Sequence, residues 1–199
     1  MIKRTHSFPI CTIGDAELRD RQPISSLFHD IAGKTKGVTA LERAVWNWQF
    51  TDRGLQDRLE AQDRYINLVA EDGENFVGLA FATAMSGHQH TFAERSRGGP
   101  NFLRLNWIGI RQDWRHHAAR LDGKATLADM MITIVKSRLD PAQDFIDACV
   151  QNHHPIAREL LERNGFVPND SEKVGFFIDP ATLKIGDLEE NYTYYRYTP

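Results

Sequence analysis

A predicted strand, turn and helix follow one another between residues 103 and 135, and this succession constrains the fold more than any other stretch. Residues 103–110 (LRLNWIGI) are apolar and rich in β-formers, which predicts a buried strand. After Thr126 the apolar residues recur at helical spacing instead: Leu127, Met130, Met131, Ile134 and Val135. A strand that passes through a turn into an amphipathic helix is typical of α/β domains, in which helices pack on a sheet.

The turn before this helix, residues 120–126 (RLDGKAT), has features of a phosphate-binding loop. A helix start presents free backbone N–H groups and the positive end of the helix dipole, which suits a phosphate. Gly123 and Ala125 leave the backbone open to close approach, and Lys124 adds positive charge. A plain structural turn is the alternative, because a strand–turn–helix with one glycine occurs in many α/β domains.

Length and composition predict one domain, residues 1–199, of ordinary globular type, with 41% hydrophobic and 26% charged residues. The net charge of −3 gives no electrostatic footprint for nucleic acid. The two cysteines form no disulfide framework, and the sequence has no 18-residue apolar run or signal-peptide pattern. We therefore expect a cytoplasmic protein that does not span a membrane.

The rest of the chain continues the mixed pattern. A hairpin over 65–82 is the clearest prediction, and residues 85–101 are expected to form a long loop containing His88 and His90. Those two histidines are interpreted as loop residues rather than a metal site, because no acidic or cysteine partner is near in sequence. The other predicted strands are 8–13, 144–150, 173–178 and 192–197, and the other predicted helices are 16–20 (capped by Asp15 and interrupted by Pro23), 24–31, about 40–50, 55–59 and 155–164.

Two stretches resemble signatures of the GNAT superfamily, the Gcn5-related N-acetyltransferases. Residues 152–166 (NHHPIARELLERNGF) resemble its helix-to-strand motif, which has an Asn after the fifth strand, an Ala in the helix and an ending close to Glu-Arg-x-Gly-Phe. Residues 120–125 (RLDGKA) fit its Gln/Arg-x-x-Gly-x-Gly/Ala motif after the fourth strand. The order and separation of the two agree with the family. The resemblance implies an α/β fold with a mixed central sheet of about seven strands and helices on both faces.

The resemblance also implies acetyl-CoA, or another acyl-CoA, as co-substrate, with no metal. In the family the fourth and fifth strands splay apart, and the pantetheine arm lies between them. Backbone groups of Ile108 and Ile110 would then pair with the pantetheine, and Asn152 would contact the cofactor. The N–H groups of the turn would hold the pyrophosphate, assisted by a basic side chain: Arg120, Asp122, Gly123, Lys124, Ala125 and Thr126. An amine-bearing acceptor would attack the thioester directly. Homodimers are common in the family.

The sequence departs from the family pattern in two places. The loop after Ile110 is longer than usual, so an alternative register places Arg115 at the arginine of the motif; we prefer residues 120–125. The helix position often held by a tyrosine that protonates the leaving thiolate is Leu161. Tyr194, among four tyrosines in residues 192–197, is the substitute we nominate, against the alternative that these tyrosines pack an edge strand.

Two residues are candidates for handling the proton of the amine. Asp147 interrupts an apolar strand, where burial can turn a carboxylate into a useful base; the alternative is a strand-end aspartate bonded to loop backbone. Asn106 lies where some relatives carry an acid, and it can orient a water. His116 and His117 have suitable chemistry but lie in the predicted insertion. Cys149 is expected to be an inert core thiol.

Two functions from different classes follow. The first is an N-acetyltransferase that moves an acetyl group from acetyl-CoA to a primary amine of a small molecule or peptide in a ternary complex. The second is a catalytically inactive GNAT-fold module that binds CoA or a protein. The missing tyrosine favours the second, and the intact phosphate turn favours the first.

Overall fold

A computed structural model describes residues 11–34, 52–73, 75–87, 99–115, 125–169 and 192–199. They form one seven-stranded sheet with the strand order β1-β2-β3-β4-β5-β7-β6. Every neighbouring pair is antiparallel except β4 and β5, which are parallel. The strands are β1 (Cys11–Asp15), β2 (Tyr65–Asp72), β3 (Asn75–Gly87), β4 (Gly99–Ile110), β5 (Phe145–Gln151), β6 (Val167–Pro168) and β7 (Tyr192–Tyr197). The fold is therefore the mixed α/β sheet predicted from the sequence.

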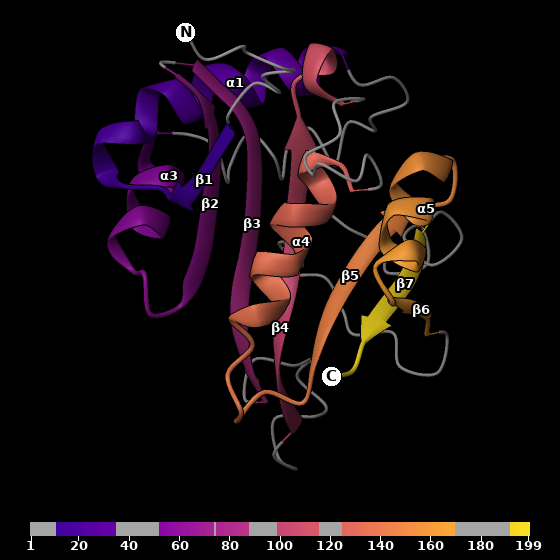
Figure 1. Cartoon of the computed structure of the whole chain (residues 1–199). Helices are drawn as coiled ribbons and strands as arrows, with labels where there is room; N and C mark the ends of the chain where they lie inside the picture. The colour runs from indigo at the N-terminus through magenta and orange to yellow at the C-terminus, as the bar shows by residue number, and fades with distance from the viewer. Residues whose placement is uncertain (1–10, 35–51, 74, 88–98, 116–124, 170–191) are drawn as a thin grey trace, which may run out of the picture.

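Helices cover both faces of this sheet (Figure 1). One face carries α4 and α5, and the other carries α1 and α3. The two faces have separate apolar clusters: Met131, Val135 and Leu161 belong to the first, and Phe28, Leu55 and Phe81 to the second. The helical elements are η1 (Leu18–Asp20), α1 (Arg21–Lys34), α3 (Asp52–Glu60), η2 (Gln112–Trp114), α4 (Leu127–Ser137) and α5 (Pro155–Arg163).

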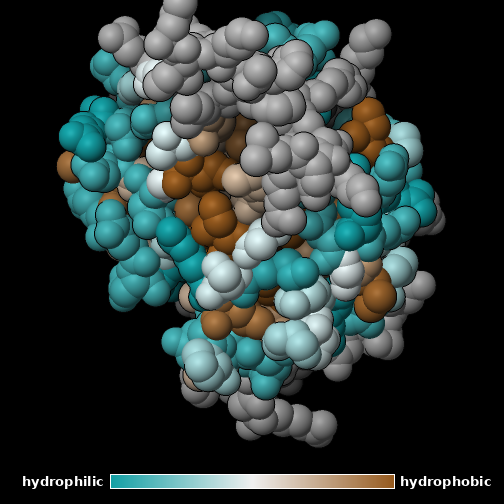
Figure 2. Space-filling model, viewed as in Figure 1, coloured by the Kyte–Doolittle hydropathy of each residue, from teal (hydrophilic) through white to brown (hydrophobic). Residues whose placement is uncertain are grey.

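Hydrophobic residues are distributed unevenly over the surface on the side of α4 and α5. Figure 2, seen from the same side as Figure 1, shows hydrophobic surface gathered beside α4, over the strands next to it, while the outer surface elsewhere is mostly hydrophilic. Partly buried Cys11 and Ile13 of β1 pack against the cluster on this side. Among the described residues, no helix combines the length and the apolar content needed to cross a bilayer.

Local sequence signals set the ends of several elements. Thr126 is the N-cap of α4, and Pro155 occupies the first turn of α5, where the missing N–H of proline costs no helical bond. Gly165 ends α5 with φ +81°, and Gly73 turns the β2–β3 hairpin with φ +63°, both in the left-handed region that favours glycine. These boundaries agree with the predictions.

Several predicted boundaries were wrong. Asp15 is the last residue of β1 and caps no helix; Glu17 caps η1 in a reciprocal arrangement with Asp20. Pro23 lies within the first turn of α1 and does not interrupt it. The hairpin partners are longer than predicted, because β3 runs to Gly87 and β4 begins at Gly99. β7 lies between β5 and β6, so its tyrosines do not form an edge strand.

Other predicted features lie outside the described residues. These are the helix over 40–50, the strand over 173–178, the histidines at 88, 90, 116 and 117, and the turn residues 120–124.

Candidate active site between β4 and β5

The two parallel strands at the centre of the sheet separate partway along their length. β4 and β5 pair from Phe102 with Phe145 to Leu105 with Ala148. Beyond that point β4 continues to Ile110 and β5 continues to Gln151, with no pairing between them. The divergence is visible in Figure 1, where β5 leans away from β4 toward β7. The main chains of the two strands therefore diverge in a V at their free ends, as the resemblance implied, and we call this separation of the main chains the opening.

The main-chain N–H and C=O groups of two predicted residues on β4, Ile108 and Ile110, face this opening. The N–H of Arg111 donates to the carbonyl of Val77 on β3, at 2.9 Å. Because main-chain groups alternate in direction along a strand, those of Ile110 and Ile108 point to the opposite side, which is the opening. The Ile110 carbonyl already accepts a hydrogen bond from Arg115 Nε at 3.0 Å. Arg115 is exposed, so its guanidinium places a positive charge at the rim.

The start of α4 lies at the open end of the strands but is partly occupied by its own side chains. The N–H and the hydroxyl of Thr126 both donate to Asp129 Oδ2, each at 2.7 Å. The helical ladder begins with the Met130 N–H bonded to the Thr126 carbonyl at 3.1 Å. The Thr126 N–H is therefore unavailable to a phosphate, and the first amides of α4 that remain are those of Leu127 and Ala128. Ala125, next to the turn, is half-buried.

Asp129 also ties α4 to the family-like motif at the end of α5. Arg163 Nε donates to Asp129 Oδ1 at 2.7 Å, and Asn164 Nδ2 donates to the same oxygen at 2.7 Å. Burial opposes ionisation of this carboxyl, but its hydrogen bonds from Arg163, Thr126 and Asn164 lower the pKa of Asp129 to about 2. The Arg-Asn of the motif therefore has a structural role in holding the two helices together.

Asn152 follows β5 at the other side of the open end. Its Oδ1 accepts from the Thr193 hydroxyl of β7 at 2.6 Å, and the side chain is exposed. The neighbouring Gln151 is buried and donates through Nε2 to the Tyr192 hydroxyl at 3.1 Å. Asn152 thus lies between β5 and α5 with its side chain bonded to β7, and its contact with a cofactor stays a prediction.

The three predicted catalytic residues share the sheet face that carries α1 and α3. Ile146, Ala148 and Tyr195 belong to the apolar cluster on the α4 and α5 face. Because side chains alternate along a strand, Asp147 and Tyr194 point the other way. Asp147 lies opposite Arg104 on β4, and Arg104 Nη2 donates to Asp147 Oδ2 at 3.3 Å. Tyr194 lies opposite Cys149 and is buried.

Asn106 belongs to this face through its contacts. Its Oδ1 accepts from the Thr83 hydroxyl of β3 at 2.6 Å and from Arg58 Nη2 of α3 at 3.2 Å. On β3, Ala82 pairs with Leu105 and Phe81 with Trp107, so Asn106 is the extra residue of a β-bulge. This bulge begins one residue after the last pair between β4 and β5.

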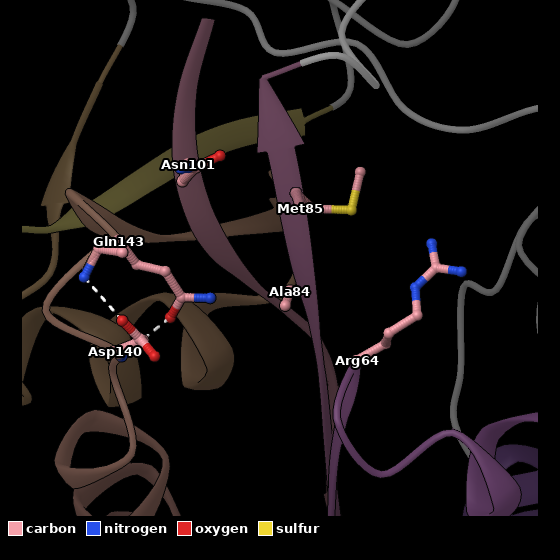
Figure 3. A pocket seen from close by; sticks show the side chains of 7 residues that line it. Arg64, Ala84, Met85, Asn101, Asp140 and Gln143 are labelled. Atoms are coloured by element: carbon pink, nitrogen blue, oxygen red, sulfur yellow. Dashed lines mark hydrogen bonds between the residues drawn. The ribbon is translucent and has the colours of Figure 1, made fainter.

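A cavity of about 320 Å³ lies elsewhere, where β3 ends and β4 begins (Figure 3). Asp140 and Gln143 of its wall hydrogen-bond to each other: the Asp140 N–H donates to Gln143 Oε1 at 3.1 Å and the Gln143 N–H to the Asp140 carbonyl at 2.8 Å. This end of the sheet is the one where β4 and β5 are still paired, so the cavity is separate from the opening. Its lining residues are Arg64, Ala84, Met85, Asn101, Asp140, Ala142 and Gln143.

Sequence reasoning missed three residues of the site. Arg58, Thr83 and Arg104 come from α3, β3 and β4, and they contact the predicted residues only once the chain is folded. A charged residue in the apolar run of β4 was a signal for Arg104, because such a side chain needs a partner when buried. No comparable signal marked Arg58, which lies in a charged helix.

Comparison with known proteins agrees with this geometry. No family model matches the sequence, and the search of curated proteins finds no match either. Solved structures do match over nearly the whole chain, and several of them are acetyltransferases of the GNAT family. The chain therefore has the GNAT acetyltransferase fold, and the predicted resemblance is confirmed.

Three of these structures illustrate the likeness. A GNAT-family acetyltransferase from Streptococcus pneumoniae has a TM-score of 0.61 and 14% identity, covering 96% of this chain and 100% of its own. Arabidopsis thaliana NAA60 in complex with acetyl-CoA has a TM-score of 0.60 and 12% identity, covering 95% and 98%. The PaiA N-acetyltransferase from Thermoplasma acidophilum in complex with coenzyme A has a TM-score of 0.58 and 10% identity, covering 94% and 99%. Sequence identities this low show that the fold is shared and show nothing about a shared activity.

Proposed function

We propose that the chain is an acyl-CoA-dependent N-acyltransferase, which transfers an acetyl group from acetyl-CoA to a primary amine of a small molecule or peptide. The observation that carries this proposal is the separation of β4 and β5 after Leu105 and Ala148. A separated pair of strands exposes main-chain groups that would otherwise be bonded, and an extended ligand with amides can pair with them as an added strand.

Pantetheine is such a ligand, and the main chain of Ile108 and Ile110 faces the space it would enter. Arg115 holds the Ile110 carbonyl, so its guanidinium is positioned to meet the pyrophosphate at the rim. Arg120, Asp122, Gly123 and Lys124 of the predicted turn, with Ala125 and the first amides of α4, complete the phosphate site in this proposal. The Thr126 N–H is excluded from it because Asp129 accepts its hydrogen bond.

The transfer itself needs a neutral amine beside the thioester. The amine nitrogen attacks the thioester carbonyl carbon, the carbon–sulfur bond breaks, CoA leaves as a thiolate that takes up a proton, and the amine loses one. Tyr194 is the proposed donor of the proton to the thiolate. Water carries the amine proton away in this scheme, because the Asp147 carboxylate is buried and its Oδ2 already accepts from Arg104.

A CoA-binding module without catalysis is the second candidate. It is favoured by the pairing of Asp147, which is the one carboxylate within β4, β5 and β7. The two candidates share the cofactor site and differ in turnover.

Thermal unfolding with and without acetyl-CoA or CoA tests the cofactor site. We expect both ligands to raise the melting temperature of the wild type. Arg115→Ala should weaken the ligand affinity by about tenfold, the value of one charge-assisted contact. Arg138→Ala is the matched control, because Arg138 lies at the far end of α4. Absence of any shift in the wild type would overturn the proposal; a shift without CoA thiol release from a panel of amines would favour the inactive module.

A further inference from the structure

The side chain of Asn106 is held by two donors at the mouth of the opening. Thr83 lies on β3 and Arg58 on α3, and both donate to the same oxygen, at 2.6 and 3.2 Å. The bulge that contains Asn106 follows directly after the last β4–β5 pair. The amide is therefore fixed in one orientation beside the place where the strands part.

Arg58 decides which end of the Asn106 amide faces it. A guanidinium has only donors, so the atom it contacts must be the amide oxygen. The Nδ2 group, with two N–H bonds, then points away from Arg58 and Thr83. The other neighbour of β4 at this position is the opening, and within the described part of the chain Nδ2 has no hydrogen-bond partner. Asn106 can therefore donate to a ligand through Nδ2, whereas its oxygen already accepts two hydrogen bonds.

Arg58 adds positive charge that no carboxylate of the described residues neutralises. Its side chain is 7% exposed, and the contacts that it makes within the described residues are with neutral groups: Thr83, Asn106 and the rings of Tyr65 and Phe81, at 4.7 and 5.3 Å. Burial lowers the pKa of Arg58 to about 10, which still leaves it cationic at neutral pH. A second cation is disfavoured next to it, whereas a carbonyl or carboxylate oxygen is attracted.

We propose that this side of the opening selects an acceptor whose amine has a carbonyl or carboxylate oxygen on the neighbouring carbon, with Asn106 Nδ2 donating to that oxygen. The acceptor class is therefore the α-amino acyl group, found in amino-acid derivatives and at peptide N-termini. Arg58 is a positioning residue that orients Asn106. This inference rests on the proposed N-acyltransferase function and narrows its substrate.

The acid–base chemistry of the acceptor agrees with this class. An α-amino group has a pKa of about 8, so roughly a quarter is neutral at pH 7.5; an alkylamine of the lysine type, with a pKa of about 10.4, is neutral to about 0.1%. Because Asp147 on β5 already accepts from Arg104, we do not assign it the deprotonation of the second kind. An α-amine reaches the reactive form without a strong base.

Side-chain amide NMR tests the contact without depending on turnover. The Asn106 NH₂ signals are assigned by their loss in Asn106→Asp, which keeps the shape and an oxygen for Arg58. With CoA bound, glycinamide should shift these signals, whereas 1-aminopropane, which lacks the oxygen, and spermidine should not. Equal shifts with 1-aminopropane would overturn the proposal, as would a full shift with acetyl-CoA alone, which would assign Nδ2 to the thioester carbonyl.

Steady-state kinetics give the second test. Asn106→Asp should raise KM for glycinamide by about tenfold or more and leave KM for 1-aminopropane unchanged. Glycylglycine as acceptor distinguishes a peptide N-terminus from a free amino-acid derivative. A fall in kcat at constant KM would contradict a role in acceptor binding. If acetyl-CoA does not raise the melting temperature of the wild type, the proposed function itself is refuted. If acetyl-CoA does raise it but spermidine is a better substrate than glycinamide, only this inference is refuted.

Discussion

The guanidinium of Arg104 and the carboxylate of Asp147 lie 3.3 Å apart on parallel strands, one residue pair before β4 and β5 separate. Their side chains are 9% and 2% exposed, so the pair is shielded from solvent. A buried carboxylate that loses its cation keeps its desolvation cost without compensation. We infer that this ion pair fixes the closed end of the opening.

Arg104→Met should therefore destabilise the protein by about 1.5–3 kcal/mol, because Asp147 stays buried and loses the charged hydrogen-bond donor of Arg104. Urea denaturation followed by circular dichroism measures the loss. The double variant Arg104→Met/Asp147→Leu should recover much of it, since both charges are removed together.

The surface pair Arg138–Asp15 is the matched control for this measurement, because its side chains are 36% and 56% exposed. Arg138→Ala should cost no more than about 1 kcal/mol. Equal losses of unfolding free energy for Arg104→Met and Arg138→Ala would contradict the structural role of the buried pair.

Asp147→Asn should lower stability and leave the pH dependence of the reaction rate unchanged. A shifted pH–rate profile would instead make Asp147 the base.

Gly109→Ala should destabilise the open end of β4. A Cβ at Gly109 would collide with the ring of Trp107, which packs edge-on against Phe28 of α1 at a centroid distance of 5.5 Å. Displacing that ring should cost about 1–3 kcal/mol, the usual range for overpacking. The urea midpoint and the tryptophan emission report the change. Gly14→Ala on β1 is the control, since a Cβ there meets no atom within 4 Å.

Asp129 predicts a specific acid sensitivity. Its folded pKa is lowered to about 2, below the unfolded value of about 3.9, so the folded state binds fewer protons. The stabilisation is complete above the unfolded value and is lost as the pH falls through the folded value. Asp129→Asn should be less stable than the wild type at pH 7, and the difference in melting temperature should shrink between pH 4 and pH 2. A difference constant over this range would contradict the assignment.

Cys11 should react slowly with thiol reagents. Burial raises the pKa of Cys11 to about 11, and the charge of Asp72 adds to the effect, so little thiolate exists at pH 8. In Cys149→Ser, labelling by iodoacetamide should be much slower for the native protein than after unfolding in urea, and it should accelerate as the pH rises toward 11. Fast native labelling at pH 8 would show that the thiol is not shielded in this way.

Much of the fold was predictable because the signals are local. The helical spacing after Thr126, the proline that starts α5 and the glycine that ends it each depend on a few neighbouring residues, and each is confirmed. The errors arose where tertiary pairing overrides local preference. The polar ends of β3 and β4 look like loop, yet they pair with each other from Met85 opposite Phe102 to Gly87 opposite Gly99.

The site was predictable only in part for the same reason. The sequence nominates Ile108, Asn106 and Asp147, and the sheet places all three beside the separation of the strands. It does not contain the distance that brings Arg58 to Asn106, whereas the contact of Asp129 with Thr126 is a local capping box between residues three positions apart. The first contact occupies the Asn106 oxygen, and the role of this side chain toward water or substrate stays a prediction. The second removes one amide from the predicted phosphate site.

The extra residue at Asn106 also changes how β4 must be aligned with other sequences. Before it, the odd-numbered Leu103 and Leu105 pack toward α4; after it, the even-numbered Ile108 and Ile110 do so. A one-residue deletion here would exchange the faces of Trp107 and Ile108, moving an indole into the space beside α4 and an isoleucine onto α1. Alignments that ignore this offset will compare side chains on opposite faces of the sheet for the whole length of the strand beyond it.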